Sequence, residues 1–197
     1  MKEIKFRLTF TEPILGTSAA NEDIYRDFIG GKAPDAARLE EEVAALGVDA
    51  VAEKGMTVFP KLDDGTPFLY DYQIKGFFKG ACGGLRRANG TASAKLKAYK
   101  KEIDMLIFPQ PRCIPLLFDG EIQTCQRPLR AQTMQGERVS LAMSEEVPAG
   151  AVIEFSVICL RDDLVDFVRE WLDYGSLSGI GQWRNSGKGR FRWEELP

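Results

Sequence analysis

Alternating polar and apolar residues at the start of the chain predict a half-buried β-strand. Between residues 4 and 10, Ile, Phe and Leu alternate with Lys, Arg and Thr, and the pattern ends before Pro13. Alternation of this kind places every apolar side chain on one face of a strand. We therefore expect a strand over residues 4–10 and a turn over residues 13–16.

A second pattern, with apolar residues every three or four positions, runs from Leu164 to Leu172. This spacing is typical of a helix that buries one face. Asp162 precedes the pattern and is a suitable N-cap residue. Gly175 follows it, and we expect the helix to end there.

Weaker patterns complete the predicted architecture. Helices are expected at 21–29, at 34–53 and, mixed with glycine, at 73–87, and a loop with a short exposed helix is expected at 88–101. Strands are expected to begin near 105–108 and to continue at 112–118, 123–126, 139–144 and 151–160, with a short strand at 56–60 and a last one at 189–194. This order favours an α+β fold of the ferredoxin-like kind, with an antiparallel sheet and helices on one face. Because no internal repeat or linker is visible, we expect a single domain over residues 1–197.

Charge is distributed unevenly along the chain. Residues 21–65 contain eleven acidic and five basic residues, a net charge of −6, whereas residues 67–101 contain eight basic residues and one acidic residue, a net charge of +7. A second basic stretch, at 184–192, lies in a segment with no acidic residue between Gly175 and Trp193. Five of the 19 glycines lie in 76–90 and five more in 175–189, so basic residues and glycines coincide twice.

Composition excludes several classes of protein. The 197 residues are 44% hydrophobic and 28% charged, which is typical of a globular protein with a core. The absence of histidine excludes a Ser-His-Asp hydrolase and removes the commonest metal ligand. No cofactor or metal is expected, because the four cysteines form no CxxC pair; we expect them to be reduced and mostly buried (Cys82, Cys113, Cys125 and Cys159).

The sequence also predicts a cytoplasmic location without a membrane partner. No apolar run approaches the ~20 residues that a membrane-spanning helix needs. The first ten residues alternate charged and apolar positions and lack the apolar core of a secretory signal.

The two basic, glycine-rich stretches indicate anion binding. Glycine lets backbone N–H groups approach a phosphate closely, and Lys or Arg nearby supplies positive charge. Phe77, Tyr99 or Trp183 would provide stacking surfaces for unpaired bases if exposed. The alternatives are that the glycines form turns, that the bases are a solvated surface, and that Phe77 or its neighbour is part of the core.

Three motifs stand in a fixed order along the chain. The first is a strand ending in Pro-Ile-Leu-Gly (10–16), and the second is Pro-Phe-Leu-x-x-x-x-Ile-Lys-Gly-x-x-Lys-Gly (67–80) followed by Leu-Arg. The third begins with Glu-Val-Pro-Ala-Gly (146–150) and continues, after a helix, to Gly-Ile-Gly-x-x-Arg-x-x-Gly-x-Gly-Arg-Phe (179–191). Together, from residue 4 to about residue 194, they resemble the RAMP (repeat-associated mysterious protein) superfamily, and most closely the backbone subunits that hold guide RNA in CRISPR effector complexes.

The resemblance implies a modified RNA-recognition-motif fold with a glycine-rich loop before the last strand. It also implies a β-hairpin thumb, here at 119–140, while 19–64 would be a helical acidic insertion. Guide RNA, other subunits and copies of the chain itself would be its partners. The RNA-binding positions that it implies are Lys75, Lys79, Arg86, Arg87, Gly179, Gly181, Arg184, Gly187, Lys188 and Arg190, with Arg127, Arg130 and Met134 in the thumb.

Two other functions stay open beside that of a non-catalytic RNA-binding subunit. A phage or mobile-element inhibitor that mimics such a subunit would fit the acidic segment 21–65, because docking on a protein does not require a basic surface. A metal-dependent ribonuclease would need Asp23 and Asp27 to converge on a magnesium ion.

Overall fold

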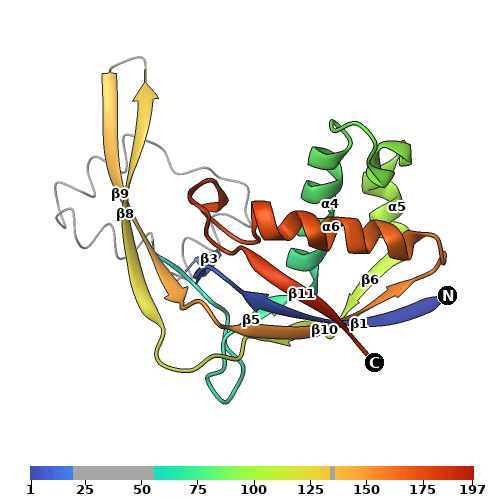
Figure 1. Ribbon diagram of the computed structural model, residues 1–197. Helices are drawn as coiled ribbons and strands as arrows, with labels where there is room; N and C mark the ends of the chain where they lie inside the picture. The colour runs from blue at the N-terminus through green and yellow to red at the C-terminus, as the bar shows by residue number, and fades with distance from the viewer. Residues whose placement is uncertain (20–55, 134–135) are drawn as a thin grey trace. The chain divides into compact units, whose positions relative to one another are not determined.

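The computed structural model describes residues 1–19, 56–133 and 136–197, and it divides into two compact units (Figure 1). Unit 1 comprises Met1–Ile14, Pro60–Glu121 and Val147–Pro197, and unit 2 comprises Leu15–Phe59 and Ile122–Glu146. We expected one domain over 1–197; the two units are described separately below. The helices expected at 21–29 and 34–53, and with them most of the acidic insertion 19–64, lie outside the described residues.

The main sheet of unit 1 is antiparallel, in the order β11-β1-β10-β6. The predicted first strand is confirmed as β1 (Lys2–Phe10), which lies between β10 (Val152–Cys159) and β11 (Phe191–Leu196). The edge strand β6 (Ile107–Gln110) pairs with β10. Alternate residues of β1 and β10 are buried, so one face of the sheet carries the core.

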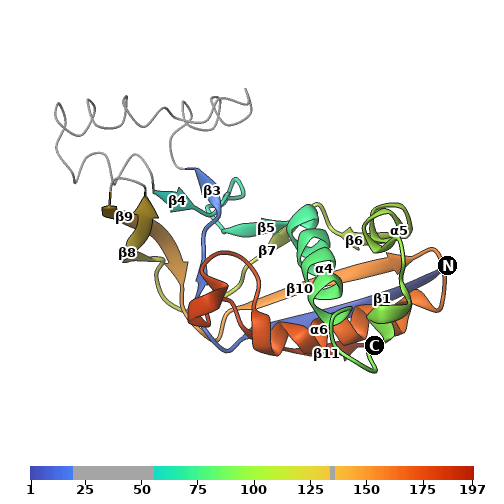
Figure 2. The same cartoon turned by 90° about the horizontal axis from the view of Figure 1, so that it is seen from above.

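Two helices cover that face, as Figures 1 and 2 show. They are α4 (Asp71–Leu85) and α6 (Leu164–Ser178). Aromatic contacts join the two helices to each other and to the sheet. Phe78 on α4 lies 5.5 Å from Trp171 on α6, and Phe77 lies 5.5 Å from Phe191 on β11, between ring centroids. The mixed α+β class with an antiparallel sheet is therefore confirmed.

Short elements complete unit 1. The strand β5 (Phe68–Tyr70), directly before α4, pairs antiparallel with β7 (Cys113–Pro115). After α4 come the 3₁₀ turn η1 (Ala92–Lys95) and α5 (Tyr99–Leu106). The loop and short helix expected at 88–101 are thus confirmed only in part, because α5 continues to Leu106 and the strand expected from residue 105 begins at Ile107. A second 3₁₀ turn, η2 (Arg184–Ser186), lies between α6 and β11.

Unit 2 contains a β-hairpin. Its strands are β8 (Gln123–Thr133) and β9 (Gly136–Val147), with register running from Gln123 opposite Glu146 to Thr133 opposite Gly136. Both strands are longer than the segments 123–126 and 139–144 that the sequence indicated. Short strands complete the second sheet: β2 (Ile14–Leu15), β3 (Ser18–Ala19) and β4 (Thr57–Val58).

The expected ends of α6 were wrong. Asp163, not Asp162, is the N-cap residue, and its side chain makes no capping hydrogen bond because it pairs with Arg161 at 2.6 Å. At the other end the helix continues past Gly175 to Ser178. Position 175 requires glycine because a Cβ there would collide with the Phe191 ring. The residue that ends the helix is Gly179, whose φ is +68°.

Several chemical features of the described residues bear on function. No helix within them is long and apolar enough to cross a membrane. All four cysteines are free thiols; Cys82 and Cys159 are buried, whereas Cys113 and Cys125 are partly exposed. Burial raises the pKa of Cys159 to about 11. Among residues 1–19, 56–133 and 136–197 no three Cys, Asp or Glu side chains come together to hold a metal, and Asp23 and Asp27 lie outside these ranges.

Candidate nucleic-acid interface

One side of α4 exposes bare backbone. Gly76 and Gly80 are four positions apart, which places them on the same side of the helix, and both are exposed. A Cβ at Gly76 would have no atom within 4 Å, and one at Gly80 would meet only Arg184 Nη1, at 3.8 Å. The next glycines differ, because Gly83 and Gly84 leave room for tyrosine hydroxyl groups, at 3.0 and 3.1 Å from the added Cβ.

The segment between α6 and β11 is a closed loop, residues 179–190. Gly179, Gly181, Gly187 and Gly189 all have positive φ, between +68° and +89°. At Gly189 a side chain is excluded by space as well, since a Cβ would overlap the Ile180 carbonyl. Ile180 N donates to Gly189 O at 2.9 Å and Gly189 N donates to Pro13 O at 2.8 Å, so the base of the loop is fixed to the turn that follows β1.

The loop brings Arg184 to α4 and keeps Arg190 against its own Gly187. Arg184 reaches the exposed side of α4 at Gly80, and the Arg190 guanidinium carbon lies 3.7 Å from the position of a Cβ at Gly187. The structure thus brings together the two basic, glycine-rich stretches, which are about 100 residues apart in sequence. Within the part of the chain that the structure describes, Arg87, Arg184 and Arg190 are exposed and form no ion pair.

The basic residues in the middle of α4 are partnered by α5. Lys79 Nζ lies 2.6 Å from Asp104 Oδ1, and Lys75 Nζ donates to Asp104 O at 3.2 Å. Burial lowers the pKa of Lys75. Arg86 lies over the Tyr99 ring, 5.0 Å from its centroid. These three cations are therefore less available to a ligand than Arg184 and Arg190 of the loop.

The two arginines expected in the thumb belong to unit 2. Arg127 is 6% exposed and donates from Nη1 to Ser144 Oγ at 3.0 Å. Ser144 Oγ is in turn 2.7 Å from Thr57 Oγ1, so Arg127 lies in a network that joins β8, β9 and β4. Of Arg130, only the backbone is described, where it pairs with Val139.

The three aromatic residues considered for base stacking differ in how exposed they are. Phe77 is 5% exposed and contacts Phe191, so the core interpretation is confirmed for it. Tyr99 is half-buried beside Arg86, whereas Trp183 is 38% exposed at the tip of the loop. Sequence reasoning missed another aromatic group, Tyr70 and Tyr72, which lie beside Arg112 at the start of α4.

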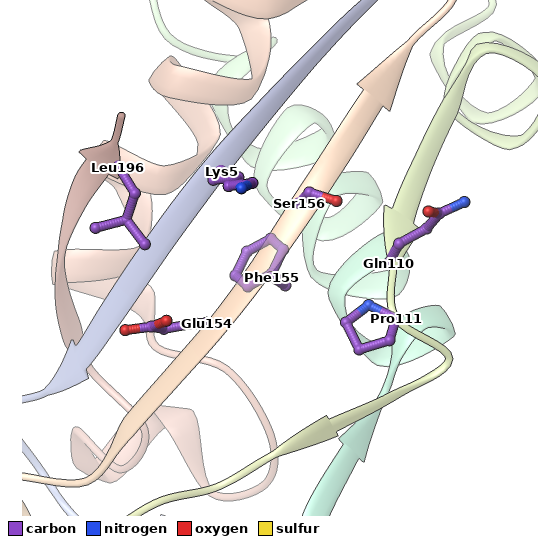
Figure 3. Close-up of a pocket in the computed structure, with 7 residues that line it drawn as sticks. All are labelled: Lys5, Gln110, Pro111, Glu154, Phe155, Ser156 and Leu196. Atoms are coloured by element: carbon purple, nitrogen blue, oxygen red, sulfur yellow. The ribbon is translucent and has the colours of Figure 1, made fainter.

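The uncovered face of the main sheet is a poor surface for phosphate. Figure 3 shows a shallow groove on this face, with Lys5, Glu154 and Ser156 in front of the strands. Arg7 lies 2.7 Å from Glu154 and 2.9 Å from Glu194, and hydrogen bonds to these two carboxylates raise its pKa. Because these acids compensate Arg7, the side of α4 next to the loop is the better candidate for an anionic ligand.

Comparison with known proteins identifies the fold. No protein-family model and no curated protein matches the chain. The structure is similar to a chain in the structure described as "Cryo-EM structure of the Type III-B Cmr-beta bound to cognate target RNA", with a TM-score of 0.53 and 10% sequence identity. The match covers 99% of this chain and 61% of that chain, so this chain spans about three fifths of the other. The chain therefore has the fold of a chain from a Type III-B Cmr complex.

Proposed function

We propose that this protein is a RAMP-type, RNA-binding subunit of a CRISPR ribonucleoprotein complex. Along the chain the elements of unit 1 occur in the order β1, α4, β6, β10, α6, β11, which is the βαββαβ order of ferredoxin-like folds. The strand order β11-β1-β10-β6 and the two helices on one face agree with that class. The similarity to a chain of a Cmr complex supports the same assignment.

The observation that carries the proposal is the approach of Arg184 to Gly80. It joins a helix side without side chains, which a ligand can approach closely, to a loop of glycines and exposed cations, whose positive charge attracts phosphate groups. A surface of this kind contacts the backbone of a nucleic acid and contributes no base-specific hydrogen bonds. The protein would therefore position a guide RNA of any sequence, in the cytoplasm, beside other subunits of the complex or copies of itself.

No catalytic step enters this proposal. The chain has no histidine, and the carboxylates considered for a ribonuclease, Asp23 and Asp27, lie outside the described residues. The net charge of −3 suits a subunit whose basic surface is confined to one region and whose remaining surface faces protein partners.

Salt-dependent binding of a labelled single-stranded RNA tests the proposal. In the variant Arg184→Ala/Lys188→Ala/Arg190→Ala, affinity should fall equally for RNAs of different sequence. The slope of log affinity against log salt should fall by about 2, since each lost phosphate contact on a single strand contributes ~0.7. The matched control, Lys2→Ala/Arg161→Ala/Arg169→Ala, removes the same charge elsewhere in unit 1 and should bind like the wild type. Equal slopes in the two variants would contradict the assignment.

Co-purification distinguishes the proposed subunit from an inhibitor that mimics one. The chain is expressed together with its neighbouring genes and isolated, and the RNA and proteins that accompany it are sequenced. A discrete short RNA bound together with several subunits is the expected result. Recovery of the chain without RNA, on a foreign effector complex, would support the inhibitor instead.

A further inference from the structure

Two tyrosines and an arginine form a stack at the beginning of α4. The rings of Tyr70 and Tyr72 are stacked, with centroids 5.0 Å apart and an interplanar angle of 17°. The Arg112 guanidinium carbon lies 5.4 Å from the Tyr70 ring centroid and 5.3 Å from that of Tyr72. The cation therefore contacts both rings.

The stack is fixed by the surrounding backbone. Arg112 Nη1 lies 2.6 Å from Asp71 Oδ1, and Asp71 N donates to Arg112 O at 3.0 Å. Tyr70 pairs with Cys113 across β5 and β7, which places Arg112 next to the tyrosines. A ligand that stacks here would not have to order these side chains first.

The stack runs from the core of unit 1 to the solvent. Phe68, which is 5% exposed, contacts the Tyr70 ring edge-on at 4.9 Å. At the other end Tyr72 is 52% exposed, and the Arg112 side chain is 66% exposed. A rigid, flat aromatic surface with a cation at its side is thus open to solvent.

This surface continues the candidate interface along α4. Tyr72, Gly76 and Gly80 are spaced by four positions, so they follow one another on one side of the helix, about 6 Å apart along its axis. The stack lies at one end of this row, and Arg184 of the loop lies near Gly80 at the other. A strand whose phosphates lie against the glycines would therefore bring a base to Tyr72.

We propose that Tyr72, supported by Tyr70 and Arg112, is a stacking platform for one unpaired base of the RNA bound along α4. The proposal rests on the RNA-binding function proposed above and adds a base contact to it. Stacking uses the π-face that all bases share, so the platform would hold a base with little sequence preference. Arg112 also attracts the neighbouring phosphate, although its pairing with Asp71 reduces that charge.

Fluorescence of 2-aminopurine within a single-stranded RNA tests the platform, because stacking on an aromatic ring quenches this base. With the full-length chain we expect quenching at one position along the RNA. In Tyr72→Ala the quenching should disappear and affinity should fall about 5- to 150-fold, the range for losing one base–aromatic stack. The salt slope should stay unchanged, since no phosphate contact is lost. Tyr72→Phe should retain both quenching and affinity.

Leu177→Ala is the matched control, because Leu177 is a large apolar residue that is 68% exposed on α6, a different helix from that of Tyr72. Thermal unfolding of each variant checks that the fold is retained. If the triple loop variant lowers the salt slope while Tyr72→Ala binds and quenches like the wild type, the platform is disproved and the RNA-binding function stands. If the wild type binds no RNA, both proposals fail. A Tyr72→Phe variant as weak as Tyr72→Ala would also overturn the platform, because it would assign the effect to the hydroxyl group.

Discussion

Individual glycines in this chain have two opposite roles. Some are required by the backbone conformation of a loop, whereas others leave the backbone of a helix exposed. Gly179 and Gly189 have φ of +68° and +72°, and a side chain at either would overlap backbone atoms of the loop. Gly76 and Gly80 are helical and exposed, with free space where a side chain would be. Alanine is normally preferred over glycine in a helix, so retaining glycine at the second pair lowers helix stability without any gain in packing.

Alanine substitution should therefore change the free energy of unfolding in opposite directions at the two kinds of glycine. Gly76→Ala should increase the free energy of unfolding by about 0.5–1 kcal/mol, because alanine loses less conformational entropy in a helix. It should nevertheless weaken RNA binding, because the new methyl group separates the helix backbone from the phosphates. Gly189→Ala should lower the free energy of unfolding by at least ~2 kcal/mol, because it adds backbone strain and a collision. Urea unfolding measures the change in stability, and RNA titration measures the change in affinity. A Gly76→Ala variant that is more stable but binds RNA normally would show that the exposed glycine side of α4 is not part of the interface.

At the scale of elements, one carboxylate attaches the basic turn η1 to α6. Glu170 accepts hydrogen bonds from Ala92 N at 2.6 Å, from Ser93 N at 2.9 Å and from Ser93 Oγ. Ser93 Oγ also accepts a hydrogen bond from Trp171 Nε1 at 2.9 Å. The carboxylate thus satisfies the free N–H groups at the start of the turn.

We expect Glu170→Gln to loosen η1 without unfolding unit 1. The amide has only one oxygen to accept bonds from three donors, so the turn should lose about 1–3 kcal/mol of local stability. Trypsin should then cut faster after Lys95, which lies at the end of η1. Asp166→Asn, in the first turn of the same helix, is the control and should be cut at the wild-type rate. Equal cleavage rates in the two variants would show that the carboxylate does not fix the turn.

Elements with a simple period were predictable from the sequence, whereas those defined by distant partners were not. Alternation located β1 and β10 because each has one face in the core. The end of α6 was misplaced because Gly175 accommodates Phe191, a contact that no local pattern reveals. The hairpin strands were underestimated because β8 and β9 are fixed mainly by pairing with each other, which does not require apolar alternation.

The basic character of the candidate site was predictable from the sequence, but which of its basic residues are available to a ligand was not. Clustering of Lys, Arg and Gly located both stretches, since composition is visible in the sequence. It could not distinguish Lys79, which Asp104 neutralises, from Arg184, which reaches Gly80. The stack of Tyr72 with Arg112 was missed because its members are 40 positions apart and meet only through the pairing of β5 with β7.

At the scale of the whole molecule, unit 1 is assembled from three separate stretches of the chain, 1–14, 60–121 and 147–197. Phe191 joins them: its ring contacts Phe10 from the first stretch at 6.1 Å, Phe77 from the second at 5.5 Å, and it fills the space at Gly175 in the third. Since this residue is completely buried, unit 1 depends on its last strand.

Phe191→Ala should therefore destabilise all of unit 1 together. We expect the free energy of unfolding to fall by about 3–5 kcal/mol, the usual cost of removing a buried aromatic ring and leaving a cavity. Urea unfolding followed by tryptophan fluorescence, to which buried Trp171 contributes, and by circular dichroism should give one coincident, earlier transition. Phe108→Ala, at a ring that is 37% exposed on the edge strand β6, should cost about 1 kcal/mol or less. Equal losses in the two variants would contradict this dependence on Phe191.

The central position of β1 also determines when the protein becomes able to fold on the ribosome. Arg7 in β1 lies opposite Glu154 in β10, 147 positions later in the chain, and β11 follows later still. At ~5–20 residues per second, ribosomes need about 7–30 s to synthesise that stretch. During this time a strand with four large apolar side chains has neither of its sheet neighbours. The nascent chain therefore exposes this apolar strand long before its partner strands are made, so its yield in the cell should depend on chaperones that bind the unpaired β1 segment.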